Sequence, residues 1–251
     1  MTSKTAFITG ATSGIGKATA EIFAKNKIQL VLCGRRSERL SQLKKELGKL
    51  TNVTTLQFDV SNKEEVSKAI ASLPNEFKKI DILVNNAGNA HGLSTIQDGN
   101  LEDWDAMIDI NVKGLLYVSR AILPQMVERN EGFVVNIGSI AGKEVYPNGN
   151  VYCASKYAVN ALNKAMRIDL IKHNIRVSAI HPGAVETEFS EVRFKGDKER
   201  AKNVYKGFKA LQPEDIADII YFVVTRPYHV SIEDLIVYPT AQASATIWNK
   251  E

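Results

Sequence analysis

Short runs of apolar, often β-branched residues alternate along the chain with longer stretches in which apolar residues recur at a helical period. The short runs predict seven strands: TAFITG (5–10), IQLVLCG (28–34), TTLQFDV (54–60), KIDILVNN (79–86), GFVVNIGS (132–139), IRVSAIHPG (175–183) and EDLIVYPT (233–240). Strands that alternate with helices form parallel sheets covered on both faces. The pattern therefore predicts a doubly wound α/β fold with a seven-stranded parallel sheet.

The chain is expected to form one domain over residues 1–251, because no linker rich in Pro, Ser or Gly interrupts it and no repeat is present. One long irregular stretch, at about 190–212, is rich in charge and follows the sixth strand. Ligands of open α/β sheets bind beyond the carboxyl ends of the strands. We interpret this stretch as a substrate lid, with a solvated surface helix and loop as the alternative.

Composition narrows the class of protein. The 251 residues are 44% hydrophobic and 24% charged, and the net charge of +4 is not gathered into a basic block, so no nucleic-acid partner is expected. Cys33 and Cys153 are not spaced like metal ligands, so no metal site is expected. Two cysteines are also too few for a disulfide framework, which favours a reducing compartment. The stretch MTSKTAFITG lacks the apolar core of a signal peptide, and no run approaches the ~18 apolar residues of a membrane span. A cytoplasmic protein without membrane contact is expected.

A glycine-rich turn follows the first strand and leads into a helix expected to start near Lys17. Glycines allow a tight turn, and the N–H groups of a helix N-terminus favour a pyrophosphate. The spacing G-x-x-x-G-x-G departs from G-x-G-x-x-G, so a turn that serves only strand-to-helix geometry is the alternative. The residues predicted to bind a dinucleotide here are Gly10, Thr12, Ser13, Gly14, Ile15 and Gly16.

The residues after the second strand indicate which coenzyme is preferred. An acidic residue there would bind the ribose 2′-hydroxyl of NAD, whereas an arginine would bind the 2′-phosphate of NADP. Arg35 and Arg36 stand there without a carboxylate, which predicts NADP. The alternative is that Arg35 and Arg36 only begin a solvated helix. That interpretation suits Arg39, which lies further along the same predicted helix. After the third strand, Asp59 can accept from an adenine amino group with Val60 beside the ring, although an Asp there also serves as a helix N-cap.

Several further motifs occur in order along residues 4–238 at spacings that resemble the short-chain dehydrogenase/reductase family. They are residues 9–16, Asn85-Asn86-Ala87-Gly88, Asn111, Ser139, Tyr152-Cys153-Ala154-Ser155-Lys156 and Pro182-Gly183. The resemblance implies a Rossmann-type enzyme that transfers hydride to or from a small-molecule substrate. It also implies that Asn111, Ser139, Tyr152 and Lys156 are catalytic, with Asn111 in a water-linked proton relay through Lys156.

The chemistry of these residues is consistent with that role. Tyr152 and Lys156 are four apart in a predicted helix and so share one face. A nearby ammonium should lower the phenol's pKa from ~10 and make Tyr152 a general acid/base, while Lys156 also holds the nicotinamide ribose. Ser139, at the end of the fifth strand, can donate to the substrate oxygen. Each residue also has a structural alternative. Tyr152 could be a surface aromatic residue, Ser139 could cap a helix, and the Asn111 side chain could bind backbone groups freed by a helix kink.

Two loops complete the expected coenzyme site. Asn86, Ala87 and Gly88 follow the fourth strand, where small residues admit the adenosine ribose or simply stabilise the turn. After the sixth strand, free N–H groups can bind the nicotinamide carboxamide, and the Thr187 hydroxyl can reach it or a phosphate. The residues predicted in this second loop are Pro182, Gly183, Val185 and Thr187.

The substrate class rests on four segments that resemble NADP-dependent 3-hydroxy acid dehydrogenases: GRRSERL (34–40), PQMVERN (124–130), EFSEVRFKGD (188–197) and EDLIVYPTAQ (233–242). The resemblance implies substrates such as L-serine or 3-hydroxypropionate and their semialdehydes. A short acid needs a fixed cation, and Arg193 is the leading candidate, with Lys143 as its rival and a surface role as the alternative. Other functions left open are a carbonyl reductase acting on neutral ketones, a reductase of acyl carriers and a non-catalytic NADPH sensor.

Two predicted helices, over 101–129 and from Tyr152 onward, carry apolar or small residues around much of their circumference. A helix with a second apolar face usually buries it, so these helices are expected to pack on symmetry mates in a dimer or in the homotetramer of two-fold pairs that the family resemblance implies. The residues concerned are Trp104, Ile108, Leu115, Leu116, Ala154, Ala158, Ala161 and Ala165.

Overall fold

The computed structural model describes residues 4–251; the first three residues of the stretch MTSKTAFITG lie outside that range. A seven-stranded parallel sheet runs through it in the order β3-β2-β1-β4-β5-β6-β7, which confirms the predicted doubly wound α/β fold. The order reverses between β1 and β4, and ligands bind at such a switch point. The strands are β1 (Thr5–Ile8), β2 (Gln29–Gly34), β3 (Val53–Gln57), β4 (Ile82–Asn85), β5 (Gly132–Ile137), β6 (Ile175–Pro182) and β7 (Asp234–Val237).

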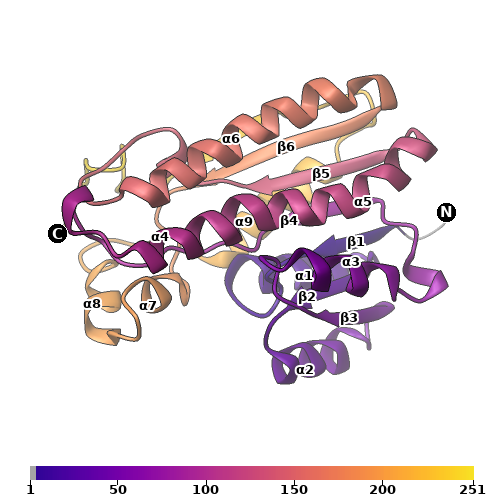
Figure 1. Ribbon diagram of the computed structural model, residues 1–251, viewed down its shortest axis with the longest axis horizontal. Coiled ribbons are helices and arrows are strands. Elements are labelled where there is room, and N and C mark those ends of the chain that lie inside the picture. The colour runs from indigo at the N-terminus through magenta and orange to yellow at the C-terminus, as the bar shows by residue number, and fades with distance from the viewer. Residues whose placement is uncertain (1–3) are drawn as a thin grey trace.

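Helices pack on both faces of the sheet (Figure 1). Strand side chains alternate between the faces: Ile8 and Leu32 enter one apolar cluster, and Phe7 and Val31 enter the other. The first cluster is completed by α1 (Gly14–Lys25), α2 (Ser37–Leu47) and α9 (Pro213–Val224). The second is completed by α3 (Lys63–Ala71), α5 (Leu115–Arg129) and α6 (Asn150–Leu170). Burial on both faces explains why the strands read as continuous apolar runs.

The helix predicted over 101–129 is not continuous. It consists of α4 (Leu101–Ile108), the π-helical segment η3 (Asp109–Gly114) and α5. A π-helical turn inside an α-helix often marks a functional site. Gly114 is required in this segment, because a Cβ there would lie 2.8 Å from the Val60 side chain.

The stretch interpreted as a lid contains two short helices, α7 (Phe189–Arg193) and α8 (Lys198–Asn203), beyond the carboxyl ends of the strands (Figure 1). Lys195 and Gly196 have φ of 52° and 91°, which turns the chain between them. Among the described residues, no helix has the length and apolar character to span a bilayer. The shorter helical turns are η1 (Asn75–Phe77), η2 (Ile96–Asp98), η4 (Ile140–Gly142) and η5 (Ile171–His173).

Candidate active site

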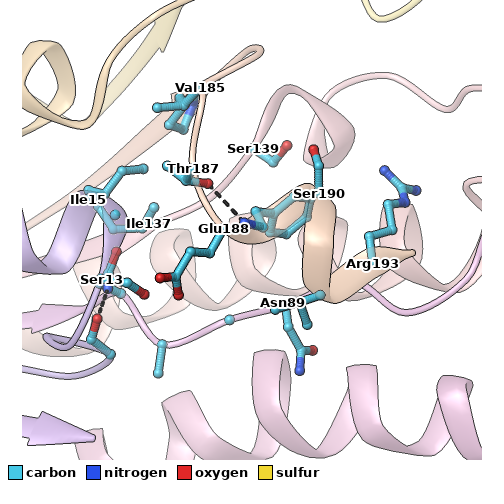
Figure 2. Close-up of a pocket in the computed structure, with 18 of the residues that line it drawn as sticks. Ser13, Ile15, Asn89, Ile137, Ser139, Val185, Thr187, Glu188, Ser190 and Arg193 are labelled. Atoms are coloured by element: carbon cyan, nitrogen blue, oxygen red, sulfur yellow. Dashed lines mark hydrogen bonds between the residues drawn. The ribbon is translucent and has the colours of Figure 1, made fainter. Parts of the chain in front are cut away.

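A cavity of about 520 Å³ opens at the carboxyl ends of the central strands. Figure 2 shows Ser13 and Ile15 toward one end of it, Ser139 and Arg193 toward the other, and Glu188 between them. Gly16 and Asn111 are not among the lining residues; Gly16 lies against the Gly10 carbonyl, and Asn111 contacts the Asn89 backbone. The predicted site residues that do line it are Gly10, Thr12, Ser13, Gly14, Ile15, Arg35, Arg36, Asp59, Val60, Asn86, Ala87, Gly88, Ser139, Tyr152, Lys156, Pro182, Gly183, Val185, Thr187 and Arg193.

The glycine-rich turn is tightly built. Gly10 has φ of +64°, and a Cβ on Gly16 would lie 2.4 Å from the Gly10 carbonyl oxygen. Helix α1 begins at Gly14 rather than near Lys17. The Ser13 side chain at its N-cap makes no capping hydrogen bond, so the first N–H groups of the helix face the cavity available for an anion. The donor set therefore fits a dinucleotide pyrophosphate.

Asn86 holds this turn in place. Its amide donates to the Thr9 carbonyl at 2.9 Å and to the Gly10 carbonyl at 3.2 Å. The Thr9 hydroxyl in turn accepts from the backbone N–H groups of Asn86 and Ala87, both at 3.0 Å. The loop after β4 thus has the stabilising role that the sequence left open, with its backbone still exposed to the cavity.

Arg36 reaches the turn more directly than Arg35 does. Its Nε and Nη2 donate to the Thr12 hydroxyl at 3.1 and 2.9 Å, and Nη2 donates to the Ser13 hydroxyl at 2.7 Å. Arg35, with a side chain 64% exposed, pairs with Asp59 at 3.3 Å. Arg39 is not merely a solvated residue of α2, because its Nη1 lies 2.7 Å from Glu188 Oε1. Three guanidinium groups therefore surround the end of β2, where a 2′-phosphate binds.

Asp59 is a partner of Arg35 and not a helix cap. Its Oδ1 accepts from the Ser61 backbone N–H and hydroxyl at 3.0 and 2.7 Å, and Asn62 caps α3 instead. Burial raises the pKa of the Asp59 carboxyl, but the hydrogen bonds from Ser61 and the charge of Arg35 together lower it below its usual value. An ionised carboxylate at the cavity wall can accept from an adenine amino group, as expected.

The three residues at the other end of the cavity come from two elements. Ser139 follows β5, and Tyr152 and Lys156 lie one turn apart on the buried face of α6. Ser139 also caps η4, since its Oγ accepts from the Ala141 N–H at 3.1 Å. Lys156 Nζ donates to the Ile137 carbonyl at 3.0 Å. An ammonium has three protons, so Lys156 can still hold a ribose hydroxyl.

The predicted effect of Lys156 on the Tyr152 phenol is wrong for this structure. Burial raises the pKa of Tyr152 well above its usual value, and hydrogen bonding to Ser139 and the charge of Arg193 offset this only in part. Burial also lowers the pKa of Lys156 from 10.5 to about 8, so Lys156 stays mostly charged at neutral pH, but its charge is not among the influences that shift the Tyr152 pKa. The phenol therefore carries its proton at neutral pH.

The buried charge of Lys156 should make folding stability depend on pH. Below pH 8 Lys156 is charged in both states, so the full cost of burying the charge is present; between about 8 and 10.5 only the unfolded chain keeps the proton, so stability rises with pH. Lys156→Met should therefore raise the free energy of unfolding by about 3 kcal/mol at pH 7 and about 1 kcal/mol at pH 10. Urea unfolding at the two pH values measures this, with exposed Lys164→Met as the control. A gain that is equal at both pH values would contradict it.

Asn111 is buried in η3 and ties three segments together. Its Oδ1 accepts from the Asn89 N–H at 2.8 Å, and its Nδ2 donates to the Asn89 carbonyl at 2.8 Å and to Ser155 Oγ at 3.0 Å. A Cβ on Gly88 would lie 3.1 Å from Asn111 Oδ1 and 3.3 Å from Lys156 Nζ, so both groups meet at this glycine. This position suits the structural role, in which the Asn111 side chain binds backbone groups at the helix interruption. The proton relay stays a prediction.

The loop after β6 offers fewer free donors than the sequence suggested. The N–H groups of Gly183, Ala184 and Glu186 donate to Val237, Gln242 and Leu211 respectively. Within residues 4–251, the Val185 N–H has no acceptor, and Val185 lines the cavity, whereas the Thr187 N–H is directed at the Tyr205 hydroxyl. The Val185 N–H is therefore the group available for a carboxamide. The Thr187 hydroxyl accepts from the Phe189 N–H at 3.1 Å.

Arg193 is not a surface residue of a charged loop. Its Nη2 donates to the Tyr146 hydroxyl at 2.8 Å and its Nε to the Gly92 carbonyl at 3.3 Å, and its guanidinium lies 5.3 Å from the centre of the Tyr152 ring. A cation is thereby fixed beside the acid/base candidate.

The rival cation, Lys143, lies outside the cavity. Its Nζ is bound to Asp234 and, at 3.0 Å, to Asn160 Oδ1, so it faces away from the reacting groups. Lys195, two residues after Arg193, pairs with Asp103 at 3.0 Å, and its side chain is 61% exposed. Arg193 is thus the better placed of the three cations.

Sequence reasoning missed several residues that shape the cavity. Phe189 packs on Tyr152 with ring centres 5.6 Å apart, and Tyr146 holds Arg193. Phe189 lies in the segment 188–197 that carries the resemblance, but no spacing there indicates its contact with Tyr152, and Tyr146 lies in no motif. The spacing of Arg36 and Arg39, three residues apart at the start of α2, was a usable signal, because such residues share a helix face. Glu188 also lies in the segment 188–197, but nothing there indicates its partners, which are about 150 positions away.

The fold and the site define a class of enzyme. A dinucleotide turn after β1, a serine after β5 and a Tyr/Lys pair on α6 are arranged for hydride transfer with a proton donor. The family model of the short chain dehydrogenases matches residues 4–198. The chain therefore belongs to the short-chain dehydrogenase family.

Individual relatives match nearly the whole chain. The NADP-dependent 3-hydroxy acid dehydrogenase YdfG of Salmonella typhi is 48% identical over 239 residues, which cover 95% of this chain and 96% of the relative. The NADP-dependent 3-hydroxy acid dehydrogenase of Schizosaccharomyces pombe is 46% identical and covers 96% of this chain and 95% of its own length. The closed form of a serine dehydrogenase complexed with NADP+ superimposes with a TM-score of 0.93 at 44% identity, over 98% of this chain and 99% of that one.

Proposed function

We propose that this protein is an NADP-dependent oxidoreductase that interconverts short 3-hydroxy acids, such as L-serine or 3-hydroxypropionate, and their semialdehydes. The observation that carries the proposal is the placement of Arg193 in the same cavity as Ser139 and Tyr152, with its guanidinium 5.3 Å from the Tyr152 ring. A planar guanidinium binds a carboxylate through two parallel hydrogen bonds. Relatives at 46–48% identity that carry the 3-hydroxy acid dehydrogenase name support this substrate class.

The residues at the coenzyme end fit NADP. Arg36 and Arg39 lie at the end of β2, where a 2′-phosphate requires cations, and the N-terminus of α1 suits the pyrophosphate. Lys156 would hold the nicotinamide ribose, and the Val185 N–H would donate to the carboxamide. NADP(H), when bound, supplies or accepts the hydride and adds positive charge beside the phenol in its oxidised form.

The chain's own residues handle the proton. In reduction, the Tyr152 phenol, which keeps its proton at neutral pH, donates to the carbonyl oxygen while Ser139 donates a second hydrogen bond to that oxygen. In oxidation, the base is the Tyr152 phenolate, which accepts the proton of the alcohol; positive charge beside the ring favours this deprotonated form. Arg193 fixes the carboxylate at the far end, so that the carbon bearing the hydroxyl group lies at Tyr152.

A substrate panel tests the proposed function. The formation of NADPH from NADP+ would be followed with L-serine, D-serine, threonine, 3-hydroxypropionate, 3-hydroxyisobutyrate and neutral alcohols. Turnover of at least one hydroxy acid in preference to the alcohols supports the proposal. Turnover of neutral alcohols alone would favour a carbonyl reductase, and binding of NADPH without turnover would favour a coenzyme sensor.

The lid and the cell compartment belong to the same proposal. Residues 190–212 form a lid of one NADP-binding domain, since α7 carries Arg193 and its neighbours Val192 and Phe194 line the cavity. Both cysteines, Cys33 and Cys153, are free and buried, which suits the reducing cytoplasm.

A homotetramer is the expected assembly. The sequence predicted a second apolar face on two helices. Four residues of that face are exposed in the single chain: Leu116, Ala154, Ala161 and Ala165. Burying them against a second copy by a two-fold axis would remove that surface from water. Light scattering at micromolar protein should give a multiple of the 27.7 kDa chain mass, and a mass near 27.7 kDa would contradict the prediction.

A further inference from the structure

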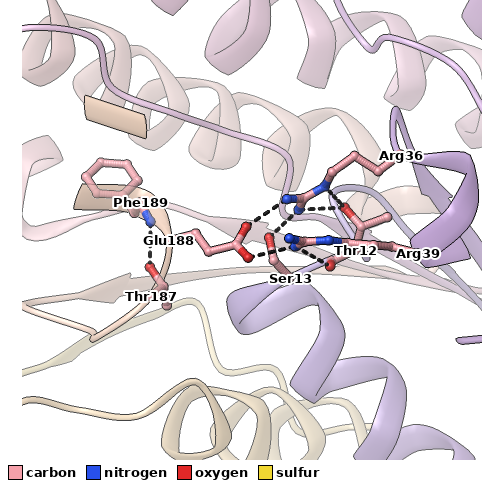
Figure 3. Close-up of polar contacts among 7 residues, drawn as sticks. All are labelled: Thr12, Ser13, Arg36, Arg39, Thr187, Glu188 and Phe189. Carbon is pink, nitrogen blue, oxygen red and sulfur yellow. Dashed lines mark hydrogen bonds and ion pairs between the residues drawn. The ribbon is translucent and has the colours of Figure 1, made fainter. Parts of the chain in front are cut away.

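Glu188 joins the lid to the arginines at the coenzyme end of the cavity. Its carboxylate stands immediately before α7, and it binds Arg36 Nη1 through Oε2 and Arg39 Nη1 through Oε1, both at 2.7 Å. Figure 3 shows the Glu188 carboxylate facing both guanidiniums, with Thr12 on their far side and Ser13 next to the carboxylate. Burial raises the pKa of Glu188, but the hydrogen bonds and charges of Arg36 and Arg39 outweigh it and lower the pKa, so the group is ionised at neutral pH.

The bridge uses the same donors that a 2′-phosphate would need. All three nitrogens of the Arg36 guanidinium group are engaged: Nε and Nη2 with the hydroxyls of Thr12 and Ser13, and Nη1 with Glu188. Carboxylates and phosphates are recognised by the same planar fork of N–H groups. A phosphate that approaches Arg36 and Arg39 must therefore share or displace the Glu188 carboxylate, and two anions on one pair of cations repel each other.

We propose that Glu188 is a specificity-determining residue that competes with the 2′-phosphate of the coenzyme for Arg36 and Arg39. The inference rests on the proposed NADP dependence and adds an internal competitor to it. Glu188 holds the start of α7 against α2 until the 2′-phosphate takes its place. Because Arg193 ends the same helix five residues later, binding at the coenzyme end is linked mechanically to the position of the substrate cation.

Two nucleotides that differ only in the 2′-phosphate test the competition. Adenosine 2′,5′-bisphosphate and adenosine 5′-monophosphate would be titrated by calorimetry into the wild-type protein, Glu188→Gln and Glu188→Ala. Loss of the competing charge should lower the Kd of the bisphosphate about three- to fivefold, the range of partly exposed ion pairs, and leave the Kd of the monophosphate unchanged. Glu191→Gln removes a carboxylate from the same helix that does not touch the arginines, so it should change neither Kd.

The outcomes separate this inference from the proposed function. A wild-type protein that binds both nucleotides equally would refute NADP dependence, and the competition with it. A wild-type preference for the bisphosphate that Glu188→Gln leaves unchanged would refute the competition alone. A weaker bisphosphate complex in Glu188→Gln would also overturn it, because Glu188 would then be a strap that secures the bound nucleotide. Two Glu188 variants are used so that the result does not depend on one substitution that misfolds. Circular dichroism verifies that each variant is folded.

Discussion

Replacing Tyr152 with Phe is expected to lower kcat by about 10²- to 10⁴-fold, the usual contribution of a positioned general acid or base. The phenyl ring keeps the contact with Phe189 and the shape of the cavity, so only the proton donor at the reacting oxygen is lost. Since Tyr152 is not needed for the arginine cluster or the glycine-rich turn, the Kd for NADPH should stay within about twofold of the wild-type value. Steady-state kinetics and a fluorescence titration of NADPH measure the two quantities.

Tyr157→Phe is the matched control. Tyr157 lies five residues later on α6, and its hydroxyl donates to the Lys143 carbonyl at 2.6 Å, outside the cavity. This variant removes one phenolic hydroxyl from the same helix and should keep its kcat. A Tyr152→Phe enzyme that retained most of its kcat would refute the acid/base assignment.

Replacing Arg193 with Ala should lower kcat/KM for 3-hydroxypropionate by 10-fold or more, corresponding to the ~1.5–3 kcal/mol of a hydrogen bond to a charged group. The matched neutral substrate is 3-methylbutan-1-ol, in which an isopropyl group replaces the carboxylate. Its kcat/KM should fall much less, because Arg193 offers it no ionic partner. The ratio of the two losses is the quantity to measure.

The design separates binding of the carboxylate from support of the lid. Arg193 also holds Tyr146 and the Gly92 carbonyl, so equal losses on acid and alcohol would mean that it only organises the lid. Lys143→Ala is the control for the rival cation, and its pairing with Asp234 predicts no selective loss on the acid. If Lys143→Ala lost the acid selectively and Arg193→Ala did not, the assignment would be reversed.

The sequence was informative where local pattern determines structure. Apolar runs bounded by turns predicted all seven strands, because burial on both sheet faces marks the inner strands, and the edge strands β3 and β7, although only partly buried, carry apolar residues as well. The four-residue spacing of Tyr152 and Lys156 predicted their shared helix face. The interruption of the helix by η3 was not predicted, because a single inserted residue hardly disturbs an apolar period.

The sequence was least informative where residues far apart in the chain meet. Glu188 and Arg36 are separated by 152 positions, and the contact between Arg193 and Tyr146 spans 47. Such contacts depend on how the lid lies over the sheet, which no local spacing records. The prediction for the Tyr152 pKa is wrong for a related reason. The ammonium was visible in the sequence, but the burial that raises the pKa comes from packing against residues distant in the chain, such as Phe189.

The central claim is that this enzyme uses NADP+ to oxidise a short hydroxy acid held by its carboxylate. It is tested most directly by the wild-type ratio of kcat/KM for 3-hydroxypropionate to that for 3-methylbutan-1-ol, measured with NADP+ at pH 7.5. We expect a ratio above about 10, since the carboxylate adds a charged hydrogen bond to Arg193. A ratio of one or less would contradict the account and identify the cavity as a site for neutral alcohols and ketones.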